Sequence, residues 1–306
     1  MRVIVFGASG VQGATQVRAL VRAGHHPVAI SRDPKPLTID GQTIETKSAD
    51  FTDHAAITTA LKDGEIIFLN LPSTSFQPSP PIIAAALAIA KAAVATPSIK
   101  LCVFNTSMPV PDVSVQVKAQ DDRREMLRLI RSTGLPTISI QPVVFLDNLL
   151  EGWARPGLVE RETIVYCHQT TLDVSWICHH DIAQLMMAAM TRPQLAGLNF
   201  PVGGPEAVRL PQLTEILSRA WGRKLKYESQ SVDDFCEKIS SAMGQRSGLD
   251  VETVVSQMRK AYTYYRESDE FNVDMSGVLK ELPVKLTKIE EWASTHPFPT
   301  QDSRAA

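Results

Sequence analysis

Short apolar runs alternate with amphipathic segments along the first half of the chain. The runs are rich in Val, Ile and Phe and predict buried strands, whereas the segments between them carry apolar residues at helical spacing. The predicted strands span residues 2–6, 27–31, 44–47, 65–70, 100–105 and 136–141, and the predicted helices span 14–23, 54–62, about 80–95 and a long segment ending at 132. This alternation predicts an α/β fold of the Rossmann type, a doubly wound parallel sheet with right-handed crossovers.

The pattern in the second half of the chain is more mixed. Short strands are expected over 164–167, 172–176 and 199–204, and helices over 182–190, with Asp181 as N-cap, over 251–267 and over 286–294. Another helix is expected to begin at about 231. We therefore predict a Rossmann domain over 1–150, completed by about 170–203. A smaller C-terminal α/β lobe, formed by 151–169 and 204–306, is expected to bind the substrate.

A glycine-rich loop joins the first predicted strand to the first helix. Its sequence is Gly7-Ala8-Ser9-Gly10-Val11-Gln12-Gly13. Gly7 allows a sharp turn, Gly10 removes the Cβ that would block a phosphate, and Gly13 allows the helix to lie close to the strand. The unpaired amides of the first helical turn then face an anion. The loop predicts a dinucleotide site formed by Gly7, Ser9, Gly10, Val11, Gln12 and Gly13.

The end of the second strand indicates which dinucleotide is bound. An NAD site usually has a carboxylate there, which binds the ribose 2′-hydroxyl. This chain has Ser31-Arg32-Asp33-Pro34, and a guanidinium suits a 2′-phosphate. Arg32 therefore favours NADP(H), the alternative being an arginine that is simply solvated at the surface.

Polar or turn residues follow the other strands of the predicted sheet. Ligands of such sheets bind beyond the carboxyl ends of the strands, so these residues are expected to converge on the cofactor. They are Asp50 and Phe51, Asn70 and Leu71, Thr106 and Ser107, and Gln141 and Pro142. For Asp50, a turn is an equally good explanation.

Composition and charge narrow the class of protein. The chain has 306 residues, of which 44% are hydrophobic and 21% charged, with a net charge of −2, which is typical of a globular protein and gives no sign of a nucleic-acid or membrane partner. The longest apolar run, 82–90, is too short to cross a bilayer. The first strand begins at the N-terminus, which leaves no room for a signal peptide, and the four cysteines form no CxxC pair, so we expect a reduced, cytoplasmic protein. No metal site is expected, because His179, His180 and Asp181 have no further ligand at a suitable spacing.

With these residues in view, the chain resembles the NmrA-like group of atypical short-chain dehydrogenases/reductases. The matching segments are the glycine loop, residues 31–34, 49–51, 132–136, 142–149 and 180–183, and the stretch 213–227 that contains Trp221-Gly222-Arg223. The resemblance implies a Rossmann domain, NADP(H) and a cleft beneath a C-terminal lobe. It adds Val144 and Phe145 to the expected cofactor-binding residues, and Phe145 and Asn148 to the substrate cleft. Members of the group include quinone, carbonyl and alkene reductases and also dinucleotide-sensing regulators.

One departure from the wider superfamily concerns catalysis. Active relatives carry Tyr-x-x-x-Lys after the fifth strand, where the tyrosine donates a proton and the lysine lowers its pKa. Here these positions fall on Ala119 and Arg123, and no tyrosine occurs between Met1 and Arg161. The remaining catalytic candidates are Ser107, Lys118 and Arg123, although charged residues on a helix usually form its solvated face.

The lobe is expected to supply the other wall of the cleft. Trp153 and Tyr262 are the candidate wall residues, and Tyr262, Tyr264 and Tyr265 either supply the missing proton or belong to a core.

Three functions remain open at this point. The first is an NADP(H)-dependent oxidoreductase acting on a small quinone, enone, enal, carbonyl or imine, as a monomer or homodimer. The second is an NADP(H) sensor that binds a protein partner without turnover. The third is a redox-neutral acid–base catalyst for a condensation or cyclisation.

Overall fold

The computed structural model describes residues 1–243 and 250–300. Eight strands form the central sheet, in the order β10-β7-β6-β5-β1-β2-β4-β3. All neighbouring strands are parallel except β3 and β4. The strands are β1 (Arg2–Phe6), β2 (His26–Ser31), β3 (Leu37–Ile39), β4 (Gln42–Ser48), β5 (Ile66–Asn70), β6 (Leu101–Asn105), β7 (Thr137–Pro142) and β10 (Asn199–Val202).

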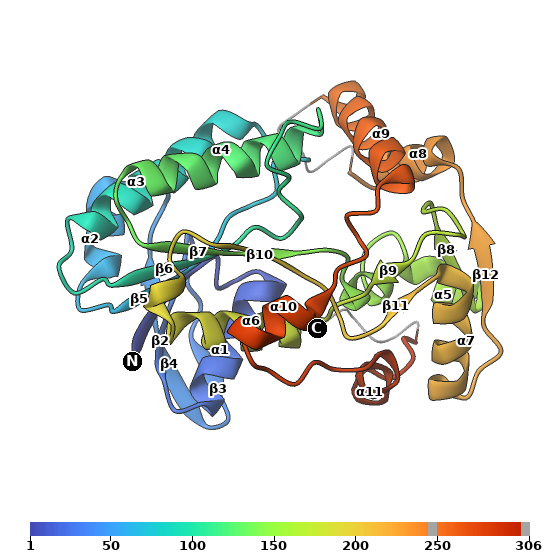
Figure 1. Cartoon of the computed structure of the whole chain (residues 1–306), viewed down its shortest axis with the longest axis horizontal. Coiled ribbons are helices and arrows are strands. Elements are labelled where there is room, and N and C mark those ends of the chain that lie inside the picture. The colour runs from blue at the N-terminus through green and yellow to red at the C-terminus, as the bar shows by residue number, and fades with distance from the viewer. Residues whose placement is uncertain (244–249, 301–306) are drawn as a thin grey trace.

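Helices cover both faces of this sheet, as Figure 1 shows. One face packs against α2 (His54–Leu61), α3 (Ser79–Val94) and α4 (Lys118–Ser132), and the other against α1 (Val11–Arg22) and α6 (His179–Met190). Two separate apolar cores result, which is why β5 and β6 are buried along their whole length. This arrangement confirms the predicted Rossmann architecture.

The β3–β4 hairpin is an element that the sequence pattern did not predict. Its turn is Asp40-Gly41, and both residues have positive φ angles, 48° and 81°. An Asp-Gly pair is a typical signal of such a tight hairpin turn. The signal was present, but β3 is only three residues long and shows no periodicity.

Two helix starts also differ from the sequence prediction. Helix α1 begins at Val11, so the last residues of the glycine loop form its first turn. Helix α6 begins at His179, so the prediction that Asp181 is its N-cap was wrong. The buried Asp181 carboxylate instead accepts hydrogen bonds from the backbone N–H (2.9 Å) and hydroxyl (2.7 Å) of Thr287. In contrast, Asp53 caps α2 through a bond from the Ala56 N–H.

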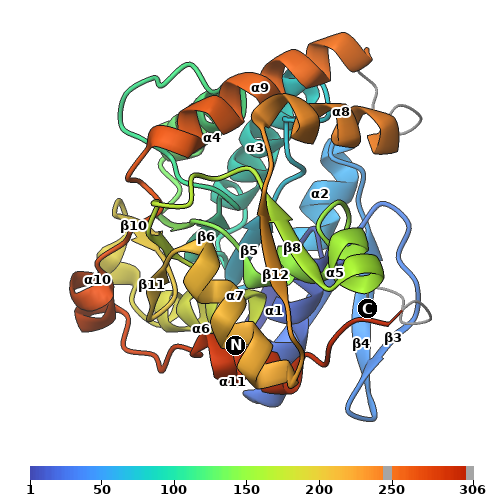
Figure 2. The same cartoon turned by 90° about the vertical axis from the view of Figure 1, so that its right-hand side faces the viewer.

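The C-terminal lobe contains two small sheets, which lie to one side of the main sheet (Figure 2). In one, β8 (Thr163–Tyr166) and β12 (Lys226–Ser229) are parallel, and in the other, β9 (Val174–Ser175) and β11 (Ala207–Val208) are antiparallel. The helical segments are η1 (Leu146–Leu150), α5 (Arg155–Arg161), η2 (Pro193–Leu195), α7 (Leu210–Trp221), α8 (Val232–Met243), α9 (Val251–Glu267), α10 (Met275–Glu281) and α11 (Ile289–Thr295).

One part of the predicted lobe packs against the Rossmann domain. Met275 and Val278 of α10, together with Leu282 and Leu286, share a core with Val3 of β1. This segment therefore crosses back to the sheet, whereas the sequence placed all of 204–306 in the lobe. The ranges 244–249 and 301–306 of the predicted lobe lie outside the described residues.

The helices and the cysteines bear on membrane crossing and on disulfide formation. Among the helices of the described residues, none combines the length and the apolar character that a bilayer crossing requires. The four cysteines are buried and unpaired, in agreement with their interpretation as core residues.

Candidate dinucleotide site

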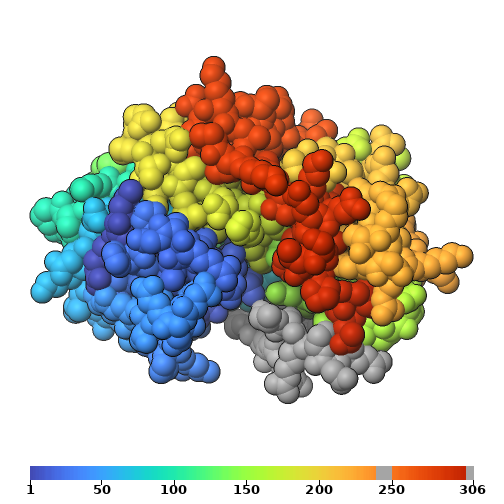
Figure 3. All heavy atoms as spheres, turned by 90° about the horizontal axis from the view of Figure 1, so that it is seen from below, coloured from blue at the N-terminus to red at the C-terminus, as the bar shows by residue number. Residues whose placement is uncertain are grey.

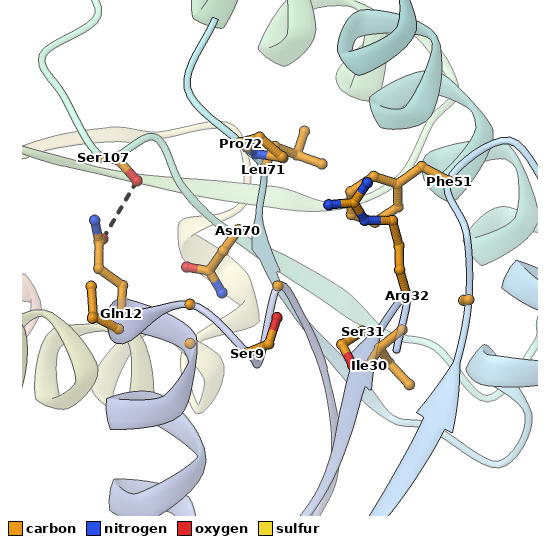
Figure 4. A pocket seen from close by; sticks show the side chains of 15 residues that line it. Ser9, Gln12, Ile30, Ser31, Arg32, Phe51, Asn70, Leu71, Pro72 and Ser107 are labelled. Atoms are coloured by element: carbon orange, nitrogen blue, oxygen red, sulfur yellow. Dashed lines mark hydrogen bonds between the residues drawn. The ribbon is translucent and has the colours of Figure 1, made fainter. Parts of the chain in front are cut away.

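A pocket of about 280 Å³ lies at the carboxyl ends of the central strands. Figure 4 shows Arg32 and Phe51 at one end of it and Gln12 and Ser107 at the other. The full lining consists of Gly7, Ser9, Gly10, Val11, Gln12, Gly13, Ile30, Ser31, Arg32, Ala49, Phe51, Asn70, Leu71, Pro72 and Ser107. The strand ends of the predicted site thus converge on one edge of the sheet, where α/β proteins bind nucleotides.

Each of the three glycines of the loop has a different structural role. Gly7 has a φ of +73°, and a Cβ there would lie 2.7 Å from the carbonyl oxygen of Asn70. A Cβ on Gly13 would lie 2.3 Å from the Gly7 carbonyl oxygen, so only glycine lets α1 pack this closely on the loop. A Cβ on Gly10 would meet only the Gly7 oxygen, at 3.4 Å, and its φ of −81° suits any residue. The fold therefore requires Gly7 and Gly13, whereas the small size of Gly10 serves the open pocket.

The N-terminus of α1 faces this open space. Its first turn contains no acidic residue, and no side chain of its N-cap residue Gly10 can bind the first amides. The unpaired N–H groups and the positive end of the helix dipole favour an anion at this position. The geometry of residues 10–13 thus suits an anion, and a contact with a cofactor phosphate stays a prediction.

Of two residues predicted to bind the cofactor, Arg32 and Asp50, only Arg32 lines the pocket. Arg32 is exposed and lines the pocket, with its backbone carbonyl held by the Ser48 hydroxyl at 2.9 Å. Asp50 does not line it: its carboxylate accepts bonds from the N–H (2.8 Å) and hydroxyl (2.6 Å) of Thr52. These bonds hold the pKa of Asp50 below its ordinary value. Of the two interpretations of Asp50, the structure supports the turn.

A buried amide network forms the floor of the pocket. The Asn70 amide donates to the Phe6 carbonyl oxygen (2.9 Å) and exchanges two bonds with the Gln16 side chain (2.8 and 2.9 Å). Its Oδ1 also accepts a bond from Asn105 at 3.0 Å. The network joins β1, α1, β5 and β6 directly beneath the glycine loop. Sequence reasoning missed Gln16 and Asn105. Asn105 is a polar residue at the end of an otherwise apolar strand, which is a signal, whereas Gln16 lies among other polar residues of α1.

The same network reaches the opposite end of the pocket through Gln12. The Gln12 Oε1 accepts a bond from Asn105 Nδ2 at 2.6 Å and a longer one from the Ser107 hydroxyl at 3.4 Å. Both partners occupy the oxygen, so the Gln12 NH2 group remains as a hydrogen-bond donor. Ser107 itself has a φ of +61°, and its N–H donates to Asn105 Oδ1.

Comparison with known proteins agrees with this geometry. The model of the NmrA-like family matches residues 1–293. The chain belongs to the NmrA-like family. A (4-alkanoyl-5-oxo-2,5-dihydrofuran-3-yl)methyl phosphate reductase of Streptomyces griseus is 30% identical over 232 residues, covering 76% of this chain and 78% of the relative.

Two solved NmrA-like structures share the fold. An NADPH-dependent quinone oxidoreductase of Escherichia coli, complexed with NADPH, superposes with a TM-score of 0.73 and 19% identity, covering 96% of this chain and 99% of that one. NmrA, a negative transcriptional regulator, in complex with NAD, gives a TM-score of 0.74 and 18% identity, covering 97% of this chain and 95% of that one.

The three catalytic candidates of this NmrA-like chain have different surroundings. Ser107 lines the pocket. Lys118 does not line the pocket. Its ammonium group forms an ion pair with the Asp122 carboxylate of the same helix, at 2.6 Å. A role for Lys118 in catalysis stays a prediction.

Arg123 occupies the position of the superfamily lysine but is turned into the protein. Its side chain is 1% exposed, and Nη2 donates to the carbonyl oxygens of Leu71 (2.7 Å) and Pro72 (3.0 Å). The guanidinium carbon lies 5.9 Å from the centre of the Phe104 ring, and burial lowers the pKa of Arg123 to about 10. Arg123 thus holds the backbone of the loop that lines the pocket, and a role for it in catalysis stays a prediction.

Four other residues expected at the cofactor lie outside this pocket. The Thr106 hydroxyl donates to the Met108 carbonyl oxygen at 2.7 Å and shapes the turn after β6. Pro142, Val144 and Phe145 are buried, and residues 143–146 are held in place by backbone bonds to Val202 and Ile177. A contact of these residues with a cofactor stays a prediction.

The predicted cleft residues of the lobe belong mainly to an aromatic cluster. The Trp153 ring packs edge-on against Tyr166 and Phe235, each at 4.7 Å between centroids, and Tyr262 lies 4.4 Å from Phe235. Asn148 forms a side-chain hydrogen bond with the Tyr166 hydroxyl. Burial raises the pKa of Tyr262 well above its ordinary value, which fits a core tyrosine. Phe145 lies apart from this cluster, against His179.

A partly buried carboxyl group connects the lobe to α4. Glu270 accepts hydrogen bonds from Gln120 Nε2 of α4 at 2.8 Å and from the Tyr264 hydroxyl of α9 at 3.3 Å. Burial raises the pKa of Glu270. Sequence reasoning did not single out this residue, because a lone glutamate in a polar segment carries no signal of its partners.

No cluster of three or more metal-ligating side chains occurs within 1–243 and 250–300.

Proposed function

We propose that this protein is an NADP(H)-dependent reductase of small conjugated acceptors, such as quinones and enones. The observation that carries the proposal is the unfilled space beside Gly10. The fold does not need a glycine there, but a phosphate approaching the amides of α1 does.

The residues of the pocket fit the parts of the cofactor. The first turn of α1 suits the pyrophosphate, and Arg32 suits the 2′-phosphate that distinguishes NADP(H) from NAD(H). Gln12 and Ser107 stand at the opposite end, where the nicotinamide half belongs. A bound NADPH supplies a hydride, and the protein supplies position and electrostatics. The NAD(P)H-dependent names of related proteins support this assignment.

The choice of conjugated acceptors follows from the missing proton donor. Ala119 has no acidic group, and Arg123 is occupied by backbone carbonyls. A simple ketone needs a proton on oxygen as the hydride arrives, whereas a reduced quinone or enone can take its proton from water afterwards. The bond from the Ser107 hydroxyl to Gln12 is long, at 3.4 Å, so the hydroxyl can rotate to donate a hydrogen bond to the acceptor oxygen instead. The Streptomyces griseus relative is named after a 5-oxo-2,5-dihydrofuran, an unsaturated lactone of this class.

A coupled binding and turnover experiment tests this function. Purified protein is titrated with NADPH and NADH by fluorescence, and NADPH consumption is then followed with menadione, cinnamaldehyde and cyclohexanone. We expect tighter binding of NADPH, and turnover of the first two acceptors but not of the ketone. Ser107→Ala should lower kcat with little change in the Kd for NADPH, whereas Ser73→Ala, outside the pocket lining, should change neither. Consumption of the ketone at a comparable rate would refute the substrate class.

A second candidate is an NADP(H) sensor without turnover, and the role of Arg123 favours it. Arg123, which stands where the superfamily has its lysine, binds the backbone of a loop and does not line the pocket. Tight NADPH binding with no oxidation by any acceptor would support this candidate. Failure to bind either dinucleotide would refute both.

A further inference from the structure

A second and larger cleft lies away from the dinucleotide pocket. It has a volume of about 710 Å³ and is bounded by α1, the start of α6 and α11. Figure 3 shows the surface hollowed between the blue N-terminal region and the red C-terminal region. The two sites share no lining residue, although α1 contributes its first turn to one and Thr15, Arg18, Ala19 and Arg22 to the other.

The deep part of this α1–α11 cleft contains an aspartate–histidine pair. His179 is 8% exposed, and Asp147 holds it twice: Oδ2 accepts the backbone N–H at 3.0 Å, and Oδ1 lies 3.5 Å from Nδ1. The Phe145 ring lies 4.8 Å from the imidazole. The backbone bond and the ring contact fix the position of the imidazole, and the nearby carboxylate favours the tautomer with its proton on Nδ1.

The opposite nitrogen of His179 is therefore a hydrogen-bond acceptor. Burial and the nearby His296 lower the pKa of His179, which favours the neutral imidazole. Within the described part of the chain, Nε2 has no protein partner. Since His179 lines the cleft, a donor that enters the cleft can bind Nε2.

Most charged residues around the cleft already have a partner of opposite charge or a hydrogen bond. Arg22 pairs with Asp40 at 2.8 Å, and Asp147 is engaged by His179. Glu291 accepts the Lys288 N–H at 3.2 Å and lies 3.6 Å from Lys285 Nζ.

Arg18 is exposed and forms no ion pair within 4 Å among the residues that the structure describes. Its charge acts on Asp40, which is already paired with Arg22. The cleft thus combines the acceptor of a largely buried histidine with an exposed guanidinium that can bind an anion.

From this combination we propose that the α1–α11 cleft is a second binding site, for a small hydroxycarboxylate. The hydroxyl group donates to His179 Nε2, and the carboxylate binds Arg18. No catalytic step is assigned to the site, and it does not depend on the reductase activity.

Calorimetric titration with 4-hydroxybenzoate, at saturating NADPH, tests the site. NADPH keeps the dinucleotide pocket filled, and the Arg18 and His179 variants distinguish heat from the α1–α11 cleft from heat of binding at the acceptor site beside NADPH. We expect benzoate, which lacks the donor, to bind about tenfold more weakly, as one hydrogen bond is worth about this factor. His179→Phe and Arg18→Gln should each weaken 4-hydroxybenzoate about tenfold, while Arg219→Gln, an exposed arginine on α7, should have no effect.

The variants also separate binding from folding. His179→Phe is checked by its melting temperature, and Arg18→Gln changes only an exposed side chain, so it remains informative if His179→Phe does not fold. The proposal is overturned if no heat is detected at millimolar 4-hydroxybenzoate, or if Arg18→Gln binds it like the wild type. Equal affinity for benzoate, or binding seen only without NADPH, would also overturn it.

Discussion

Replacing Gly10 by alanine separates the requirements of the fold from those of the ligand. The added Cβ meets only the Gly7 carbonyl oxygen, at 3.4 Å, and the backbone angles suit alanine. Alanine restricts the unfolded chain, which stabilises by about 0.4–1 kcal/mol, but it is a poorer N-cap than glycine. We therefore expect the free energy of unfolding to change by less than about 1 kcal/mol.

The same methyl group occupies space that the pyrophosphate needs. Overpacking of this kind costs about 1–3 kcal/mol, which corresponds to a Kd for NADPH that is about 5- to 150-fold higher. The matched control is Gly13→Ala, whose Cβ would lie 2.3 Å from the Gly7 oxygen and 2.8 Å from its carbonyl carbon. Backbone atoms cannot move aside cheaply, so we expect this variant to lose stability despite its better helix propensity.

Thermal unfolding and fluorescence titration with NADPH measure the two effects separately. Unchanged stability with weaker NADPH binding is the expected result for Gly10→Ala. If Gly10→Ala melts as early as Gly13→Ala, the fold needs this glycine after all. If its Kd for NADPH stays at the wild-type value, the loop is not the phosphate site.

Three further predictions concern Arg32, Arg123 and Glu270. Arg32→Ala should weaken NADPH binding much more than NADH binding in fluorescence titrations, and an equal loss for both would refute the 2′-phosphate assignment. Arg123→Met should lower the free energy of unfolding by about 1–3 kcal/mol and weaken NADPH binding, because two loop carbonyl oxygens lose their donor. The control is Arg128→Met on the exposed face of α4, which should change the free energy of unfolding by less than about 0.5 kcal/mol. Intact stability and binding with abolished turnover in Arg123→Met would instead indicate a catalytic role. The pKa of Glu270 is raised in the folded state, so the folded protein binds more protons at this residue than the unfolded chain does. The contribution of Glu270 to stability therefore falls as the pH rises from its pKa in the unfolded chain to its pKa in the folded protein. Glu270→Gln should remove that loss, so its melting temperature relative to wild type should increase between pH 4 and pH 7, and a constant difference would contradict the raised pKa.

The sequence alone determined those features whose parts are contiguous. Strand β1, the glycine loop and α1 follow one another directly, so their hydrophobic period, glycines and pocket could all be predicted. Asp53 caps α2 through an amide only three residues away, so this bond too is local in the sequence. The order of strands and helices was enough for the Rossmann sheet, since parallel strands bring their carboxyl ends to one edge.

Only the tertiary structure decided which partner a polar side chain takes from a distant segment. Asp181 looks like a helix cap, but it binds Thr287, which lies 106 residues further along the chain. Arg123 reads as a candidate for the active site, yet its partners are carbonyls of the β5 loop. The Gln16–Asn70 pair and the His179–Asp147 pair join separate elements in the same way. A linear pattern encodes burial and local geometry, whereas these bonds depend on the packing that brings distant segments together.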